Sequence, residues 1–190
     1  EHRAGVYCLL ALKDGRVVSG GRDGSVRLWD PSTDLCDPST DSIPTIIEHK
    51  GHVYCLSELD DGRVVSAGGV GGAVCIWDPS TGQAAKIITY GFQKHVTCLL
   101  VLKDGRVVFG SEDGIVRLWA RSNDRISKIA KHKGSVRCLS QLKDGHVIWG
   151  STDGSVRFWE PSTGRANQMY FSRSGIACLA CGDDPTRVYA

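Results

Sequence analysis

Short apolar runs rich in β-branched residues, separated by Asp-Gly pairs, make up most of this chain of 190 residues. The run VYCLLAL (6–12) is followed by KDG, then by RVVSG (16–20), a second Asp-Gly pair, and SVRLW (25–29). Such runs bounded by Gly and Asp are typical of β-strands, and Asp-Gly between two of them is a hairpin signal. Their apolar residues do not alternate cleanly, which indicates sheets that are covered on both faces. The pattern predicts an all-β chain.

The same unit returns along the chain. DGRVVSGGRDGSVRLWD at 14–30 recurs in related form at 61–78, 104–120 and 144–160, and its closing tryptophans lie 40 to 48 residues apart. Self-similarity of this period indicates a repeat architecture. We expect four units of four strands, with two more strands at Gly175–Ala180 and Thr186–Ala190. The outer strand of each unit is expected at Ile43–Ile47, Ala84–Tyr90, Arg125–Ala130 and Ala166–Phe171.

Two units end in Trp-Asp, at Trp29-Asp30 and Trp77-Asp78. With a period near 40 residues, this pattern resembles the WD-repeat (WD40) family of β-propellers. The resemblance implies one propeller domain over 1–190, with repeats at 2–47, 48–90, 91–130 and 131–171 and a partial repeat at 172–190. Propellers close with about 4–8 whole blades. We therefore expect the fifth blade to be completed by self-association, or the chain to be part of a longer one.

The resemblance also implies a buried hydrogen-bond tetrad in each blade, which joins a Trp, a Ser or Thr, a His and the Asp of the tight turn. The first repeat has all four members, and these are His2, Ser19, Asp23 and Trp29. In the second repeat Gly71 stands where the Asp is expected.

The third and fourth repeats carry aromatic residues at tetrad positions. Phe92 and Phe109 replace the His and the Ser of the third repeat, and Trp149 replaces the Ser of the fourth. We expect the space between these blades to be packed with apolar groups, and substitution of Asp23 to cost more stability than substitution of Asp113.

Partner binding is expected at the end of the blades where the His loops and the Asp-Gly turns meet. By resemblance, side chains at the start of the first strand and just before the turn Asp contact partners. The candidate residues are Tyr7, Arg22, His52, Tyr54, Val70, His95, Thr97, Glu112, Arg137 and Thr152. Tyr and Arg are also favoured at interaction hot spots. The sequence thus predicts a non-catalytic scaffold for protein or peptide partners.

Two other functions remain as alternatives to the scaffold. One is a self-assembling propeller fragment, for example a homodimer, whose main property is ring closure. The other is the platform domain of a larger enzyme. A Ser, a His and an Asp lie within one repeat, as in a hydrolase triad, but the resemblance assigns these residues to the buried network of the scaffold. No phosphate-binding G-x-x-x-x-G-K-[ST] motif occurs, and we expect no cofactor.

Charge and cysteines narrow the expected setting. The net charge of +2 argues against nucleic acid and anionic membranes as partners. Five cysteines recur at one position of the repeat, which indicates packing in a reducing compartment, and we expect a cytoplasmic protein. They are Cys8, Cys55, Cys98, Cys138 and Cys178. Cys178 and Cys181 form a single C-x-x-C with no second pair, so no metal site is expected.

Overall fold

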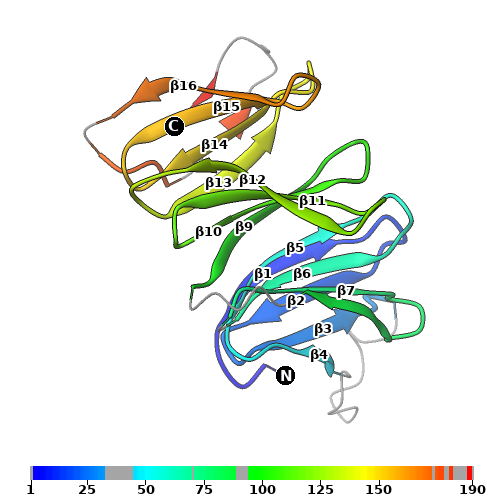
Figure 1. Ribbon diagram of the computed structural model, residues 1–190. Helices are drawn as coiled ribbons and strands as arrows, with labels where there is room; N and C mark the ends of the chain where they lie inside the picture. Colours follow the sequence, from blue (N-terminus) through cyan, green and yellow to red (C-terminus); the bar gives the residue numbers. More distant parts are fainter. Residues whose placement is uncertain are drawn as a thin grey trace. The chain divides into compact units, whose positions relative to one another are not determined.

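The computed structural model describes residues 2–32, 45–69, 71–88, 94–172, 174–177, 180–181 and 188–189. The chain folds into two compact units, Glu1–Val96 and Thr97–Ala190. Both are built from four-stranded antiparallel sheets whose strands follow one another in chain order (Figure 1). This is the succession of hairpins that the Asp-Gly spacing predicts.

The first unit holds two such sheets. One consists of β1 (Val6–Ala11), β2 (Val17–Gly21), β3 (Ser25–Trp29) and β4 (Thr45–Glu48). The other consists of β5 (Val53–Glu58), β6 (Val64–Gly68), β7 (Ala73–Trp77) and β8 (Ala84–Ile88). Each sheet is one blade of the predicted repeat.

Two further blades form the second unit, where β9 begins at the unit boundary. The third blade consists of β9 (Val96–Val101), β10 (Val107–Ser111), β11 (Ile115–Ala120) and β12 (Arg125–Lys131). The fourth consists of β13 (Val136–Gln141), β14 (Val147–Ser151), β15 (Ser155–Glu160) and β16 (Arg165–Phe171). No helix among the described residues is long and apolar enough to cross a membrane.

A short pair of strands, β17 (Ala180–Cys181) and β18 (Val188–Tyr189), follows the fourth blade. The described residues thus contain 18 strands, the number that the repeats predict. The expected strand at Gly175–Ala180 is shorter than predicted, because Gly175 and Ile176 are not in a strand. Ile176 nevertheless packs on the fourth blade beside Ile148 and Val156, and its N–H donates to the carbonyl of Ser151 (2.9 Å).

The turn between the first two strands of each blade is held by an aspartate. Asp14 accepts hydrogen bonds from the backbone N–H of Arg16 (3.0 Å) and from its Nε (2.8 Å), while Gly15 takes a positive φ of 92°. A short Asp side chain can bond the backbone two residues on, and Gly adopts positive φ without steric cost. The repeated Asp-Gly-Arg sequence therefore makes the same turn in the first three blades.

A β-bulge near the start of the first strand recurs in three blades. In β1, Val6 pairs with Gly21 and Cys8 pairs with Gly20, so Tyr7 has no partner in the ladder. The same shift occurs around Tyr54 in β5 and Arg137 in β13. A bulge redirects the side chain of the extra residue. Three of the candidate partner-binding residues are these extra residues.

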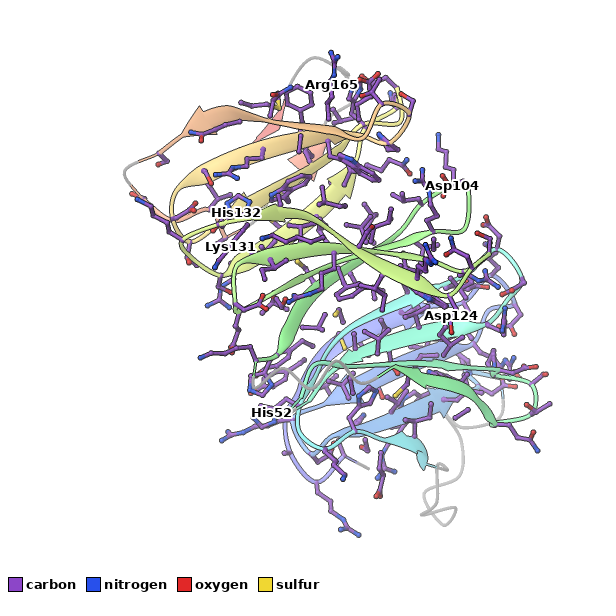
Figure 2. All side chains as sticks on the ribbon, viewed as in Figure 1. His52, Asp104, Asp124, Lys131, His132 and Arg165 are labelled. Carbon is purple, nitrogen blue, oxygen red and sulfur yellow. The ribbon has the colours of Figure 1, made fainter. Side chains whose placement is uncertain are left out.

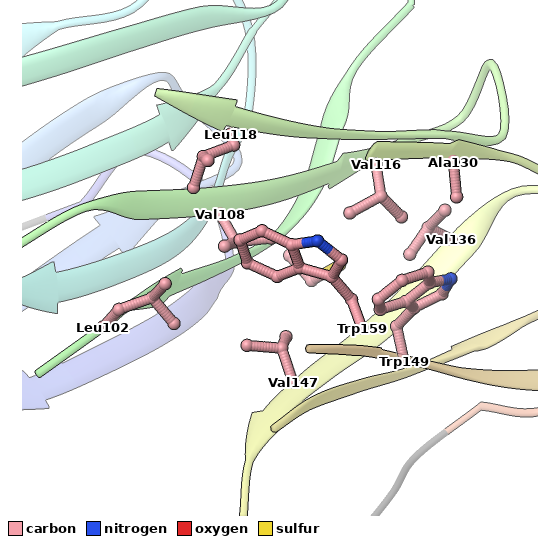
Figure 3. Packing of buried hydrophobic residues seen from close by; sticks show 10 residues of the cluster. Leu102, Val108, Val116, Leu118, Ala130, Val136, Val147, Trp149 and Trp159 are labelled. Carbon is pink, nitrogen blue, oxygen red and sulfur yellow. The ribbon is translucent and has the colours of Figure 1, made fainter. Parts of the chain in front are cut away.

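The cores lie between the sheets within each unit. In the first unit, Val53 and Trp77 of the second blade pack on Val18 and Val26 of the first. In the second unit, Trp149 and Trp159 pack among valines of β10, β11, β13 and β14 (Figure 3). All-buried strands such as β6 and β10 show why the sequence pattern does not alternate.

Candidate functional site

The first blade contains a continuous series of hydrogen bonds from Trp29 to Asp23. The Trp29 indole N–H donates to the Ser19 hydroxyl (2.7 Å), which is bonded to His2 Nε2 (2.7 Å). His2 Nδ1 in turn lies 3.1 Å from the Asp23 carboxylate. With the His2 proton on Nδ1, every donor in the series has an acceptor. The structure thus joins His2, Ser19, Asp23 and Trp29 in the order that the resemblance implies.

Asp23 is the charged end of this series. Partial burial acts to raise the pKa of the Asp23 carboxyl, but hydrogen bonds from Ser25, from the Arg3 backbone N–H and from His2 hold it well below the usual value. The carboxylate therefore stays ionised at neutral pH and can bind the His2 N–H. Ser19 is 1% exposed and is held between Trp29 and His2. This Ser-His-Asp set supports the blade, and its hydroxyl does not face solvent as a nucleophile would.

The second blade has only part of the network. His49 Nε2 is bonded to the Ser66 hydroxyl (2.9 Å), but Gly71 provides no carboxylate for the other ring nitrogen. Among the described residues, His49 Nδ1 and Trp77 Nε1 have no hydrogen-bond partner. Desolvation lowers the pKa of His49 to about 4, so this imidazole is neutral at neutral pH.

The third blade contains a buried ion pair in addition to the apolar packing that we expected. The Arg117 guanidinium, 6% exposed, donates to both oxygens of Asp113 (2.6 and 3.2 Å) and to the Ser111 hydroxyl (2.7 Å). Phe109 is buried as expected, and Phe92 lies outside the described residues. Apolar groups do fill the space between the third and fourth blades, as expected. The expectation missed this polar pair, in which a basic side chain from β11 provides the donors that the missing His would supply.

The fourth blade also combines the expected apolar packing with a polar network. The Trp149 indole N–H donates directly to His132 Nε2 (2.5 Å), in place of a serine hydroxyl. His132 Nδ1 is bonded to the Ser155 hydroxyl (2.9 Å), and Ser155 donates to Asp153 (2.5 Å). Trp149 is therefore both a buried aromatic residue and a hydrogen-bond donor. The polar network is retained with a different member.

The loop before the first strand and the Asp-Gly turn meet at one end of each blade. In the first blade the Arg22 N–H donates to the Gly5 carbonyl (2.8 Å). In the fourth, the Thr152 N–H donates to the Ser135 carbonyl (2.9 Å). The opposite end of the blades carries the Asp14-type turns, and Figure 2 shows His132 and Asp104 at opposite ends of the second unit.

A cluster of four aromatic rings lies at this end of the first unit, and we call it the ring cluster. It consists of Tyr7, His52, Tyr54 and His95, all of which are candidate partner-binding residues. Tyr7 and Tyr54 stack with their centroids 5.5 Å apart and their planes 8° apart. His52 packs edge-on against both tyrosines, at 5.7 and 5.8 Å, and His95 lies 5.6 Å from Tyr54. Offset and edge-to-face ring pairs stabilise each other beyond the apolar area that they bury.

Both histidines of the ring cluster are anchored by one nitrogen. His52 Nδ1 donates to the Arg22 carbonyl (2.5 Å), and His95 Nδ1 donates to the Gly69 carbonyl (2.8 Å). Each bond ties the loop before one first strand to the turn of the preceding blade. Since carbonyl oxygens only accept hydrogen bonds, both rings carry their proton on Nδ1. Figure 2 shows His52 at the loop end of the first unit.

The remaining candidates differ in how available they are. Arg22 is exposed at the turn of the first blade, and Val70 lies outside the described residues. In the second unit, Arg137 and Thr152 are exposed and Glu112 is half-buried. The Thr97 hydroxyl lies within hydrogen-bond distance of the backbone carbonyls of Gly110 (3.1 Å) and Val136 (2.5 Å). It can donate its single proton to either of them, and so links two strands. The sequence could not show this use of Thr97, because the acceptors come from β10 and β13.

Comparison with known protein families gives one match. The family model described as WD domain, G-beta repeat, matches residues 1–30, 41–78, 86–120 and 123–160, which together are more than half of the chain. Each matched segment ends at the residue after a third-strand tryptophan, and so holds the first three strands of one blade. The last three segments also take in all or part of the outer strand of the preceding blade, so the matched repeat is offset from the blade by one strand.

Proposed function

Because the chain belongs to the WD-repeat family, whose domains generally mediate protein–protein interactions, we propose that it is a non-catalytic scaffold. Its partner, a protein or a peptide, binds at the end of the blades that carries the loops before the first strand and the Asp-Gly turns. Family membership supports the scaffold role in general. The ring cluster supports this particular end.

The ring cluster is the observation that carries the proposal. Tyr7 is 49% exposed, although it is a large aromatic residue at a bulge. The blade network does not use it, since His2, Ser19, Asp23 and Trp29 are bonded to one another. Tyrosines combine a large rigid contact area with a polar group and are enriched at binding hot spots. A half-exposed tyrosine held in place by two neighbouring rings, those of His52 and Tyr54, is preorganised for contact with a partner.

Selection from a displayed peptide library on the immobilised chain tests this proposal. We expect the selected peptides to lose about tenfold or more in affinity for Tyr54→Ala. Lys13→Ala, at the opposite end of the first blade, should bind them as the unchanged chain does. Peptides that bind both variants equally well would place the binding surface elsewhere.

Self-association is a second candidate, which one surface favours. Val6 is 48% exposed and Leu9 is 69% exposed, and with Val17 and Trp29 they line an open, mainly apolar hollow of about 310 Å³. The corresponding Val53 and Trp77 of the second blade are fully buried against the first blade. We propose that a second copy of the chain covers this face.

Light scattering at several concentrations tests self-association. The unchanged chain should show a dimer mass, and Leu9→Lys, which places a charge on the apolar face, should give a monomer. Lys13→Glu, which changes the charge at an exposed position, is the control and should leave the dimer mass unchanged. A monomer for the unchanged chain at all concentrations would rule out this candidate.

A further inference from the structure

The loops around the ring cluster carry an excess of positive charge. Arg3, Arg22, Lys50 and Lys94 are all exposed and belong to the same loops and turns of the first unit as the cluster histidines. The chain as a whole is nearly balanced, with 23 basic and 21 acidic residues. The charge at this end is therefore a local feature and does not follow from the overall composition.

Among the described residues of these loops, the one acidic residue is Asp23, and its carboxylate is occupied by hydrogen bonds within the first blade. The loop residues counted are 2–5, 22–24, 49–52, 69, 71–72 and 94–95. Asp23 accepts hydrogen bonds from the Arg3 backbone N–H (2.7 Å), the Ser25 hydroxyl (2.8 Å) and His2 (3.1 Å). Glu48, which is exposed, is the last residue of the outer strand β4. The loops thus carry a surplus of positive charge that an acidic partner could neutralise.

The geometry of the rings limits what can pack on them. The face of Tyr7 that meets Tyr54 is covered by the parallel stack, and His52 contacts both tyrosines edge-on. The exposed part of Tyr7 can therefore accept one flat side chain. Single-stranded nucleic acid is normally held by several aromatic side chains, each stacked on a successive base. A peptide needs only one contact of this kind.

The histidines add hydrogen-bonding capacity. Since Nδ1 of both His52 and His95 is used on a backbone carbonyl, Nε2 is the atom left to bind a ligand. A neutral Nε2 accepts a hydrogen bond, such as one from a peptide N–H.

From these observations we infer that the ring cluster binds an acidic peptide segment that contains one proline or aromatic residue. The flat side chain packs on Tyr7, and its acidic neighbours meet Arg22, Lys50 and the other basic side chains. This inference rests on the proposed function and adds the chemistry of the partner. It applies to the first unit alone.

Fluorescence anisotropy with labelled synthetic peptides tests the inference on the full chain. The probe is a short Glu-rich peptide with one central Trp. Matched probes replace the Trp by Ser, replace each Glu by Lys, or substitute an oligothymidine. We expect the first probe to bind best and its affinity to fall as salt is added, because exposed charges are screened. Arg22→Glu should weaken its binding about tenfold, and Lys13→Glu, the same charge change at the opposite end, should alter it less than about twofold.

The variants leave the fold intact, because the Arg22 and Lys13 side chains are exposed and the bonds of Arg22 to Gly5 and His52 use backbone atoms. Equal binding of the Glu-rich and Lys-rich probes, or tighter binding of the oligothymidine, would overturn the inference. The proposed function would survive that result if library-selected peptides of other chemistry still depended on Tyr54. If no peptide depends on Tyr54, both fail.

Discussion

At the scale of single residues, the blades satisfy the same buried polar requirement with different side chains. The first blade uses His2 and Asp23, the third uses Arg117 and Asp113, and the fourth uses Trp149 as a donor to His132. A buried polar group without a partner costs free energy, so a lost member must be replaced or its neighbour left unsatisfied. The second blade shows the unsatisfied case at His49.

The ion pair of the third blade leads to a prediction about stability. Asp113→Asn should lower the free energy of unfolding by about 3 kcal/mol, because Arg117 remains buried without its counter-charge. Urea denaturation at neutral pH measures this loss. Asp104→Asn breaks an equally short pair with Arg106 (2.6 Å), but that carboxylate is 51% exposed, so the loss should stay below about 1 kcal/mol. Equal losses for Asp113→Asn and Asp104→Asn would show that burial does not set the contribution of an ion pair to stability. Because Asp113 is paired with a buried arginine, we do not expect substitution of Asp23 to cost more stability than substitution of Asp113.

His49 predicts a dependence of stability on pH. Its pKa is lowered to about 4 in the folded chain, from an ordinary value of 6.5, so the unfolded chain binds the proton more readily between these values. The contribution of neutral His49 to the free energy of unfolding is therefore complete above pH 6.5 and is lost as the pH falls towards 4. The loss between pH 7 and pH 5 should be about 2 kcal/mol. His49→Gln should lose less stability over this interval than the unchanged chain does. Urea denaturation at both pH values provides the comparison, with His52→Gln as the control at a half-buried histidine. Identical slopes for the two variants would contradict the assignment.

At the scale of elements, the first strand of one blade lies very close to the second strand of its neighbour. A Cβ added to Gly20 would lie 2.6 Å from Val53 Cγ1 and 2.7 Å from Cys8 Sγ. The Cys8 thiol also lies within hydrogen-bond range of the Gly20 carbonyl (3.8 Å) and the Val53 carbonyl (3.7 Å). A small residue in β2 and a small thiol in β1 therefore let the next strand approach, which explains why Cys recurs at this position.

Gly20→Ala tests this close approach. The added methyl group must displace Val53 or Cys8, and we expect a loss of about 1–3 kcal/mol in unfolding free energy. Gly5→Ala is the matched control, since a Cβ there meets nothing within 4 Å, and its effect should be within about 0.5 kcal/mol. Thermal unfolding followed by circular dichroism measures both. A neutral Gly20→Ala would show that the two blades have room to separate.

At the scale of the whole molecule, folding makes Cys75 and Cys98 poor nucleophiles. Burial raises the pKa of Cys75 to about 11 and that of Cys98 to about 12, one residue in each unit. Because the thiolate is the reactive species, alkylation by iodoacetamide at pH 8 should be slower in the native chain than in urea, by about a hundredfold at Cys75 and about a thousandfold at Cys98. Mass spectrometry of the peptides that contain Cys75 and Cys98 separates the two units. Fast native labelling of one of them alone would mean that its unit opens independently.

The sequence by itself determined the fold and the end of the blades that is proposed for binding. The spacing of the tryptophans and the Asp-Gly pairs is local information, and local turns specify which strands pair. Through its resemblance to the WD-repeat family, the sequence also indicated that end of the blades and all four members of the ring cluster, which stand beside the starts of first strands. The sequence did not show that these four touch one another.

Only the tertiary structure decided how the replaced tetrad positions are satisfied. Phe109 and Trp149 look like apolar substitutions in the sequence, and both are buried, yet polar networks remain beside them. The reason is physical: a buried donor can come from any strand that packs nearby, as Arg117 does, and sequence position does not reveal that distance. The contacts among Tyr7, His52, Tyr54 and His95 were likewise decided by packing, because bulges and backbone anchors from neighbouring blades set the direction of each ring.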